Sequence, residues 1–123
     1  MKFATTLPSK RLFAAIFIFL AGLPLLRAQD DVLITEFMAS NNHTLLDEDG
    51  DASDWIELYN AGTNTVNLNG WHLTDNASDL TEWTFPATNL QPNSFMIVFA
   101  SGKNRAVAGQ ELHTDFSLSS SGE

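Results

Sequence analysis

The chain has 123 residues, of which 15 are acidic and 6 are basic, and its formal net charge is −9. It contains no cysteine, which excludes a disulfide framework, a thiolate zinc site and a cysteine nucleophile. A chain of this length can form one small domain but not two.

The N-terminal segment has the layout of a secretory signal peptide. Lys2, Lys10 and Arg11 precede the apolar run 12–20, and mostly apolar residues continue to Ala28. A basic start, a short apolar stretch and a small residue at the exit are typical of an export signal that is cleaved. The apolar stretch is short and interrupted, which disfavours a permanent membrane span. We therefore expect a signal peptide and no membrane span after its cleavage.

Cleavage after Ala28 would assign residues 1–28 to the signal peptide and residues 29–123 to the mature domain. The mature segment keeps all 15 acidic residues but only Lys103 and Arg105 as bases, so its net charge would be −13. Without a cationic surface, it is not expected to bind nucleic acid or anionic lipid. The signal peptide predicts that the protein is secreted, extracellular or in the cell envelope.

Short apolar runs alternate with turn-forming residues along the mature segment, which predicts an all-β domain. Gly, Asn and Pro in the intervening segments favour turns, and no stretch keeps a helical period. The predicted strands are 32–38, 55–59, 65–68, 71–74, 82–85, 95–100 and 112–118.

Two of these strands indicate a sandwich of two sheets. The sequence FMIVF in strand 95–100 is apolar on both faces, which is typical of a strand buried between layers. The sequence WIELY alternates, so Ile56 and Leu58 are expected to face inward. We predict that these two side chains form part of the core together with Ile97 and Phe99.

Several motifs occur in an order that spans nearly all of residues 32–123. They are ITEFMASN at 34–41, DEDGDASDWIELYN at 47–60, VNLNGWHLTD at 66–75, WTFP at 83–86 and FMIVFASGK at 95–103. In this order the motifs resemble the opening of a bacterial secreted lamin-tail domain. The resemblance implies an immunoglobulin-like β-sandwich. It also implies a secreted module, of a kind often attached to enzymatic or surface-anchoring parts.

The chain departs from the family pattern in two respects. The pattern continues beyond residues 118–123 into at least one further apolar strand, so we expect this domain to be C-terminally incomplete and to belong to a longer protein. The animal lamin tail is associated with chromatin, and the charge of the mature segment argues against that role here. The resemblance therefore implies a shared fold, and the function has to be argued from a site.

The densest candidate site is an acidic loop that contains Asp47, Asp49, Asp51 and Asp54, with Gly50 at a turn. Clustered carboxylate oxygens suit Ca²⁺, so these four aspartates are the predicted metal ligands. The spacing is not that of an EF-hand, because the required glycine and the final glutamate are absent. An equally simple interpretation is a solvated turn in which Asp54 orders the loop through backbone hydrogen bonds.

Other side chains give weaker signals for chemistry. His43, His72 and His113 are not at the spacing of a metal site, and no serine lies in the elbow motif of a hydrolase. The sequence therefore predicts no catalytic residue, and its only candidate cofactor is the calcium ion of the acidic loop.

The three tryptophans are either core residues or a platform for a carbohydrate or peptide. Packing in the core is expected for Trp71 and Trp83. The position of Trp55 stays open, because Ile56 and Leu58 already occupy the inward face of its strand.

Taken together, the sequence predicts a non-catalytic, exported interaction or scaffolding module of the lamin-tail type, at the N-terminus of a larger secreted or surface protein. Its expected partner is an extracellular protein or a glycan. One alternative is the accessory domain of an exported hydrolase whose catalytic part lies beyond Glu123. Another is a module that binds a glycan or the cell wall.

Overall fold

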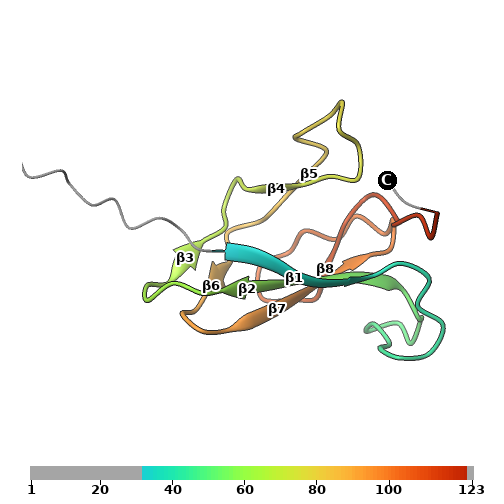
Figure 1. The fold of residues 1–123 in the computed structure, drawn as a ribbon, viewed down its shortest axis with the longest axis horizontal. Coiled ribbons are helices and arrows are strands. Elements are labelled where there is room, and N and C mark those ends of the chain that lie inside the picture. The colour runs from blue at the N-terminus through green and yellow to red at the C-terminus, as the bar shows by residue number, and fades with distance from the viewer. Residues whose placement is uncertain (1–31, 122–123) are drawn as a thin grey trace, which may run out of the picture.

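The computed structural model describes residues 32–121, so the predicted signal peptide lies outside the described residues (Figure 1). All regular elements between residues 32 and 121 are strands, as the sequence predicted. This part of the chain contains no helix long and apolar enough to cross a membrane. The strands are β1 (Val32–Met38), β2 (Asp54–Asn60), β3 (Val66–Asn67), β4 (His72–Leu73), β5 (Trp83–Thr84), β6 (Asn89–Leu90), β7 (Phe95–Ala100) and β8 (Leu112–His113).

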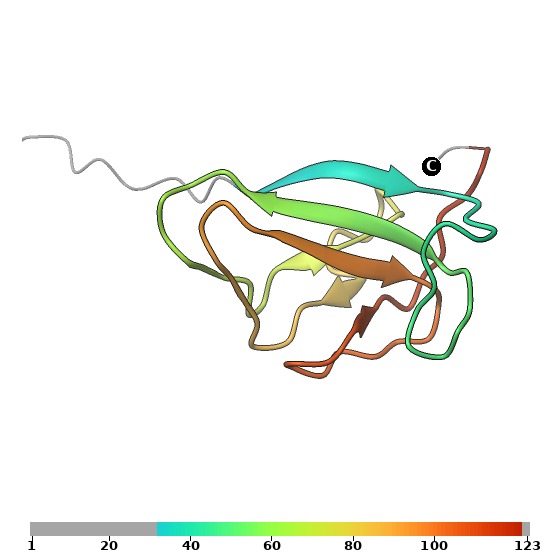
Figure 2. The ribbon, with the colours of Figure 1, turned by 90° about the horizontal axis from the view of Figure 1, so that it is seen from below.

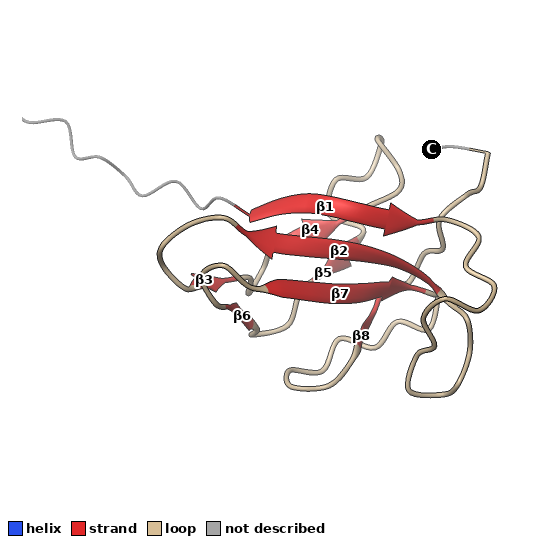
Figure 3. Ribbon diagram, turned by 60° about the horizontal axis from the view of Figure 1, so that its bottom comes forward, coloured by secondary structure: helices blue, strands red, loops and turns tan. Residues whose placement is uncertain are grey.

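Strands β1, β2, β7 and β8 form one sheet in that order, which is the larger layer of the domain. The first three strands pair in antiparallel fashion, whereas β7 and β8 are parallel. The two-stranded sheets β3–β6 and β4–β5 lie behind this sheet and form the second layer (Figures 2 and 3). The arrangement is the sandwich that the sequence predicted.

The core lies between the two layers. Ile56 is opposite Val98 and Leu58 is opposite Met96, and directly opposed residues of antiparallel strands point to the same face. The buried members of the core cluster are Ile56, Leu58, Val66, Leu68, Trp83, Phe85, Leu90, Val98, Ala100, Leu112 and Phe116. Trp71 is partly buried and packs against this cluster, so the prediction that Trp71 and Trp83 pack in the core is confirmed.

Phe99 is buried as predicted, but the prediction that Ile97 and Phe99 share this core cluster was wrong. The register places Ile97 opposite Glu57 and Phe99 opposite Trp55, so both point to the other face of the sheet. The FMIVF sequence is apolar at every position, and the sequence alone therefore could not show which alternate residues face inward.

The other face of the sheet carries a second row of side chains, of which all but Met38 are buried. Met38, Trp55, Phe99 and His113 are cross-strand neighbours, one from each of the four strands. The rings of Phe99 and His113 stack with their centroids 5.3 Å apart, and Trp55 is only 7% exposed. This row settles the position of Trp55, which is buried on the face opposite the main core.

Strand β1 is an edge strand with an irregular register. The register shifts between Ile34 and Glu36, so that Ile34 is opposite Leu58 and Phe37 is opposite Ile56. Both side chains therefore lie on the core-facing side of the sheet. They are nevertheless 58% and 66% exposed, respectively. The second layer does not cover this part of the sheet.

Candidate functional site

The acidic loop between β1 and β2 is organised around Asp47, whose side chain is buried. Its Oδ1 accepts hydrogen bonds from the backbone N–H groups of Asp49 (3.1 Å) and Asp51 (3.0 Å). Its Oδ2 accepts one from the Ser53 hydroxyl at 2.7 Å. Gly50 has φ of +82°, a backbone conformation that glycine adopts without the penalty of a Cβ atom. The loop is thus a tight turn closed by its own aspartate.

Lys103, from the segment after β7, inserts its ammonium group among three aspartates. Its Nζ lies 2.6 Å from Asp47 Oδ2, 2.7 Å from Asp49 Oδ2 and 2.9 Å from Asp51 Oδ2. Three charge-assisted hydrogen bonds use all the donors that an ammonium group has. The lysine therefore connects the acidic loop to the β7–β8 segment.

This contact shifts the pKa values of both partners. Burial by itself would raise the pKa of Asp47. Hydrogen bonds from Lys103, Ser53 and two backbone N–H groups outweigh burial and hold the pKa well below its ordinary value. Burial would likewise lower the pKa of Lys103, but its hydrogen bonds to the three aspartates raise that pKa above its ordinary range. Asp47 and Lys103 are therefore both charged across the physiological pH range.

Arg105 is the second cation in this region. Its Nη1 lies 2.7 Å from Glu48 Oε1, and its Nη2 lies 2.8 Å from Asp49 Oδ2. The pKa of Asp49 is lowered mainly by the hydrogen bond from Arg105 and then by that from Lys103. These carboxylates are partly exposed, so solvent screens the Arg105 contacts more than it screens the contact between Lys103 and Asp47.

Asp54 is not part of this cluster. Its Oδ1 accepts hydrogen bonds from the backbone N–H groups of Ser40 (2.7 Å) and Asn41 (2.8 Å) at the end of β1. Ser40 has φ of +79°, so this carboxylate fixes a turn with an unfavourable backbone conformation. Asp54 orders the loop in the way that the solvated-turn interpretation predicted.

Of the four predicted calcium ligands, the structure thus brings three together and separates one. Asp47, Asp49 and Asp51 each offer an oxygen atom, and these atoms lie within 4.8 Å of one another. The ammonium group of Lys103 contacts all three, so a calcium ion at this position has to displace it. The calcium hypothesis therefore becomes one of competition between Ca²⁺ and Lys103.

Sequence reasoning missed Lys103 and Arg105 as site residues, although a signal existed. They are the only two bases between residues 29 and 123. In a segment with such an excess of acidic residues, a loop of clustered carboxylates attracts the few bases that are present. Their distance along the chain from the aspartates, 56 residues for Asp47, hides the pairing from any local motif.

A second group of metal-ligand types lies beside the acidic loop. Glu48, Glu111 and His113 each offer one atom, and these atoms lie within 4.8 Å of one another. The backbone N–H of Glu48 donates to Glu111 Oε2 at 2.7 Å, which holds the two glutamates together. His43 and His72, in contrast, are exposed and lie outside this group.

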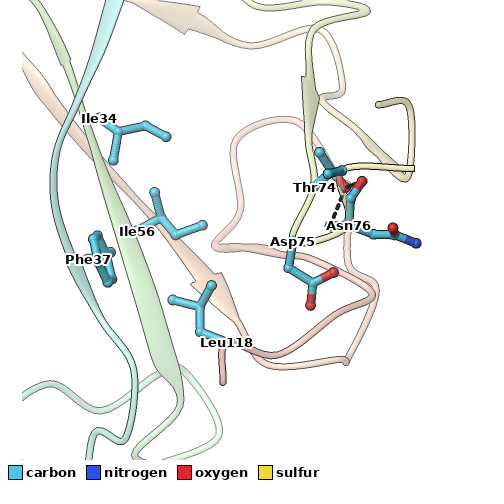
Figure 4. Close-up of a pocket in the computed structure, with 8 residues that line it drawn as sticks. Ile34, Phe37, Ile56, Thr74, Asp75, Asn76 and Leu118 are labelled. Atoms are coloured by element: carbon cyan, nitrogen blue, oxygen red, sulfur yellow. Dashed lines mark hydrogen bonds between the residues drawn. The ribbon is translucent and has the colours of Figure 1, made fainter. Parts of the chain in front are cut away.

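An apolar groove of about 410 Å³ lies at the edge of the sandwich. Ile34, Phe37 and Ile56 form one wall, and the segment from Thr74 to Ala77 forms the other. Figure 4 shows these walls with Leu118 between them. Leu118 is partly buried and packs against the core cluster, so the floor of the groove adjoins the apolar core.

The sequence and the fold together decide the family. The family model of the Lamin Tail Domain matches residues 26–123, which is most of the chain. This chain belongs to the lamin-tail domain family. No curated protein and no solved structure matches it. The lamin-tail domain is a non-enzymatic, immunoglobulin-like module, and the sandwich of residues 32–121 agrees with that fold.

Proposed function

We propose that this lamin-tail domain is a non-catalytic, exported interaction module whose apolar groove binds an extended segment of a partner polypeptide. The observation that carries the proposal is the exposure of Ile34 and Phe37 on the core-facing side of β1. Large apolar side chains beside a hollow favour burial by another apolar surface. An edge strand offers unpaired backbone groups to an extended segment, as in β-strand addition.

The charge of the domain favours a partner with basic residues beside its apolar positions. Of the 15 acidic residues, Asp30, Asp31 and Glu123 lie outside residues 32–121, which leaves 12 acidic residues against two bases. Both bases already pair with the acidic loop. A net charge of −10 disfavours a second copy of this domain as the occupant and attracts a cationic segment.

The proposed module is the N-terminal part of a larger secreted or surface protein. The alternative is an accessory domain of an exported hydrolase whose catalytic part follows Glu123. Reading the gene downstream of this codon separates the two, because only the alternative requires a hydrolase domain in frame.

A glycan-binding role has weaker support than a peptide-binding role. Trp55 and Trp83 are buried and Trp71 is partly buried, so the three tryptophans do not form an exposed stacking platform. Carbohydrate rings are commonly bound on exposed aromatic faces. The groove is lined by four aliphatic side chains, one phenylalanine and the polar residues Thr74, Asp75 and Asn76.

A synthetic peptide of alternating valine and threonine with lysines at both ends is a suitable probe. We expect the purified chain to bind it, and Phe37→Ser to weaken binding at least tenfold, because burying a phenylalanine ring contributes roughly 1.5–3 kcal/mol. Leu80→Ser is the matched control, since Leu80 is 70% exposed and lies outside the groove. Fluorescence anisotropy gives the dissociation constants, and melting temperatures show that both variants fold.

Four outcomes would contradict the proposal. If the peptide does not bind, or if Phe37→Ser and Leu80→Ser weaken its binding equally, the groove is not the binding site. A peptide without lysines that binds equally well refutes the charge argument. If the gene continues and the longer product no longer binds the peptide, the groove is filled by the protein's own chain and not by a partner.

A further inference from the structure

His113 has two ring nitrogens in different surroundings. The residue lies on β8 and is fully buried, with 0% of its surface exposed. Its Nδ1 lies 2.9 Å from Ser101 Oγ, within hydrogen-bond distance. Its Nε2 is buried and has no hydrogen-bond partner among the described residues. Such a nitrogen costs free energy unless something binds it, so it calls for a ligand or a charge partner.

The unpartnered nitrogen faces one carboxylate, and a second carboxylate belongs to the same group of residues. Glu48 Oε1 lies 3.8 Å from His113 Nε2, which is too far for a hydrogen bond. Glu111 adds a second carboxylate, and one atom of each of the three residues lies within 4.8 Å of the other two. Both glutamates are exposed, while the imidazole is buried. The group therefore combines a buried nitrogen with two solvent-accessible oxygens.

We propose that Glu48, Glu111 and His113 form a binding site for a divalent transition-metal ion of the Zn²⁺ or Mn²⁺ type. An imidazole nitrogen with two carboxylate oxygens is a donor set that these ions prefer, whereas Ca²⁺ prefers oxygen ligands alone. Three protein ligands leave a coordination position for water. The site is distinct from the predicted calcium ligands, since it shares no residue with the aspartates.

The distance between His113 Nε2 and Glu48 Oε1 is close to that between two ligands of one ion. Two tetrahedral ligands at about 2.1 Å from zinc are about 3.4 Å apart. The observed 3.8 Å between Nε2 and Glu48 Oε1 requires a movement of only a few tenths of an ångström, which the exposed Glu48 side chain can make. Glu111 is held in place through the backbone of Glu48.

Ser101 supplies the contact that a metal-binding imidazole needs on its other nitrogen. When Nδ1–H donates to Ser101 Oγ, the lone pair of Nε2 points away from the serine and is available to a metal. Outer hydrogen bonds of this kind commonly fix the tautomer and orientation of a histidine ligand. In this tautomer, His113 has the arrangement of a metal ligand that is supported by Ser101.

Arg105 competes with the metal for one of the glutamates. Its Nη1 lies 2.7 Å from Glu48 Oε1, the same oxygen that faces His113. A bound cation has to share this oxygen or displace Arg105, which keeps its second contact to Asp49. Arg105→Gln is therefore expected to increase the metal affinity about threefold or more.

The test is a titration of the purified chain with Zn²⁺ and Mn²⁺, with ¹⁵N NMR of the histidine rings as the direct readout. We expect one Zn²⁺ per chain and a large shift of the His113 Nε2 resonance. Glu111→Gln and Glu48→Gln are expected to weaken binding at least tenfold, because each removes a charged ligand. Both are exposed positions, so these variants remain informative where a substitution of buried His113 would prevent folding.

Two control variants separate this site from adventitious binding. Glu36→Gln removes an exposed glutamate on β1, and His72→Gln removes an exposed histidine. Both are expected to keep Zn²⁺ affinity within about twofold. Equal losses in Glu36→Gln and Glu111→Gln would overturn the proposal. An unchanged His113 Nε2 resonance at saturating Zn²⁺ would also overturn it.

Discussion

Replacing Lys103 by methionine tests whether the acidic loop depends on its internal cation. The side chain of Asp47 has zero exposure, and its Oδ2 lies 2.6 Å from the lysine Nζ. Removing one partner of a buried ion pair costs about 3–5 kcal/mol, because the remaining charge is left without compensation. Asp47 keeps its bonds to Ser53 and to two backbone N–H groups, and the lysine is 21% exposed, so we expect a smaller loss of about 2–3 kcal/mol.

A loss of this size lowers the melting temperature of a small domain by about 10–20 °C. Thermal unfolding followed by circular dichroism at pH 7 measures it. Arg105→Met is the matched control, because it removes the other cation of the loop but uncovers only partly exposed carboxylates. A double variant, Lys103→Met/Asp47→Asn, should recover part of the loss, since it removes the uncompensated charge. Equal melting temperatures for Lys103→Met and Arg105→Met would refute this reasoning.

The pH dependence of the same pair has a defined sign. The pKa of folded Asp47 lies below its ordinary value of 3.8, so its ion pair stabilises the protein fully at pH values above the ordinary pKa. The stabilisation is lost as the pH falls from that value through the lower folded pKa. The difference in melting temperature between wild type and Lys103→Met is therefore expected to be constant from pH 5 to 8 and to narrow below about pH 4. A difference that widens in acid would contradict the assignment.

Two further predictions concern the same loop. In Lys103→Met the three aspartates lose their internal cation, so millimolar Ca²⁺ at constant ionic strength should raise the melting temperature of this variant more than that of wild type, and more than Mg²⁺ does. An equal response of Lys103→Met and wild type would contradict the hypothesis that calcium competes with Lys103. Asp54→Ala leaves the backbone N–H groups of Ser40 and Asn41 without their acceptor, and we expect a loss of about 1–2 kcal/mol in urea unfolding. A loss no larger than that of exposed Asp79→Ala would show that the turn does not need this carboxylate.

The sequence predicted the long strands well, because six or seven residues are enough for a hydrophobic pattern. Strand β1 has its predicted bounds, and β2 is longer by one residue at each end. Strand β6 was not predicted, since two residues beside the turn at 91–93 carry no periodic signal. The inward face of β7 could not be predicted because its register against β2 decides it, and the register is a tertiary property.

The acidic loop shows the same division between local and tertiary information. Its tight turn and the convergence of Asp47, Asp49 and Asp51 follow from residues a few positions apart, which a local motif can reveal. The contacts of Lys103 and the approach of Glu111 to Glu48, 63 residues away, arise only when β7 and β8 join the sheet. The local part of the site was therefore predictable, and its cation and its histidine were not.

The distribution of charge links the loop to the rest of the domain. Both bases of residues 32–121 lie between β7 and β8, and both contact the loop between β1 and β2. Arg105 contacts the Glu48 oxygen that faces His113, so a cation that neutralises the loop also competes with a metal at the proposed site. The apolar groove shares no residue with either cluster. Substitutions in the groove and in the loop should therefore have additive effects on stability, because sites without shared partners act independently.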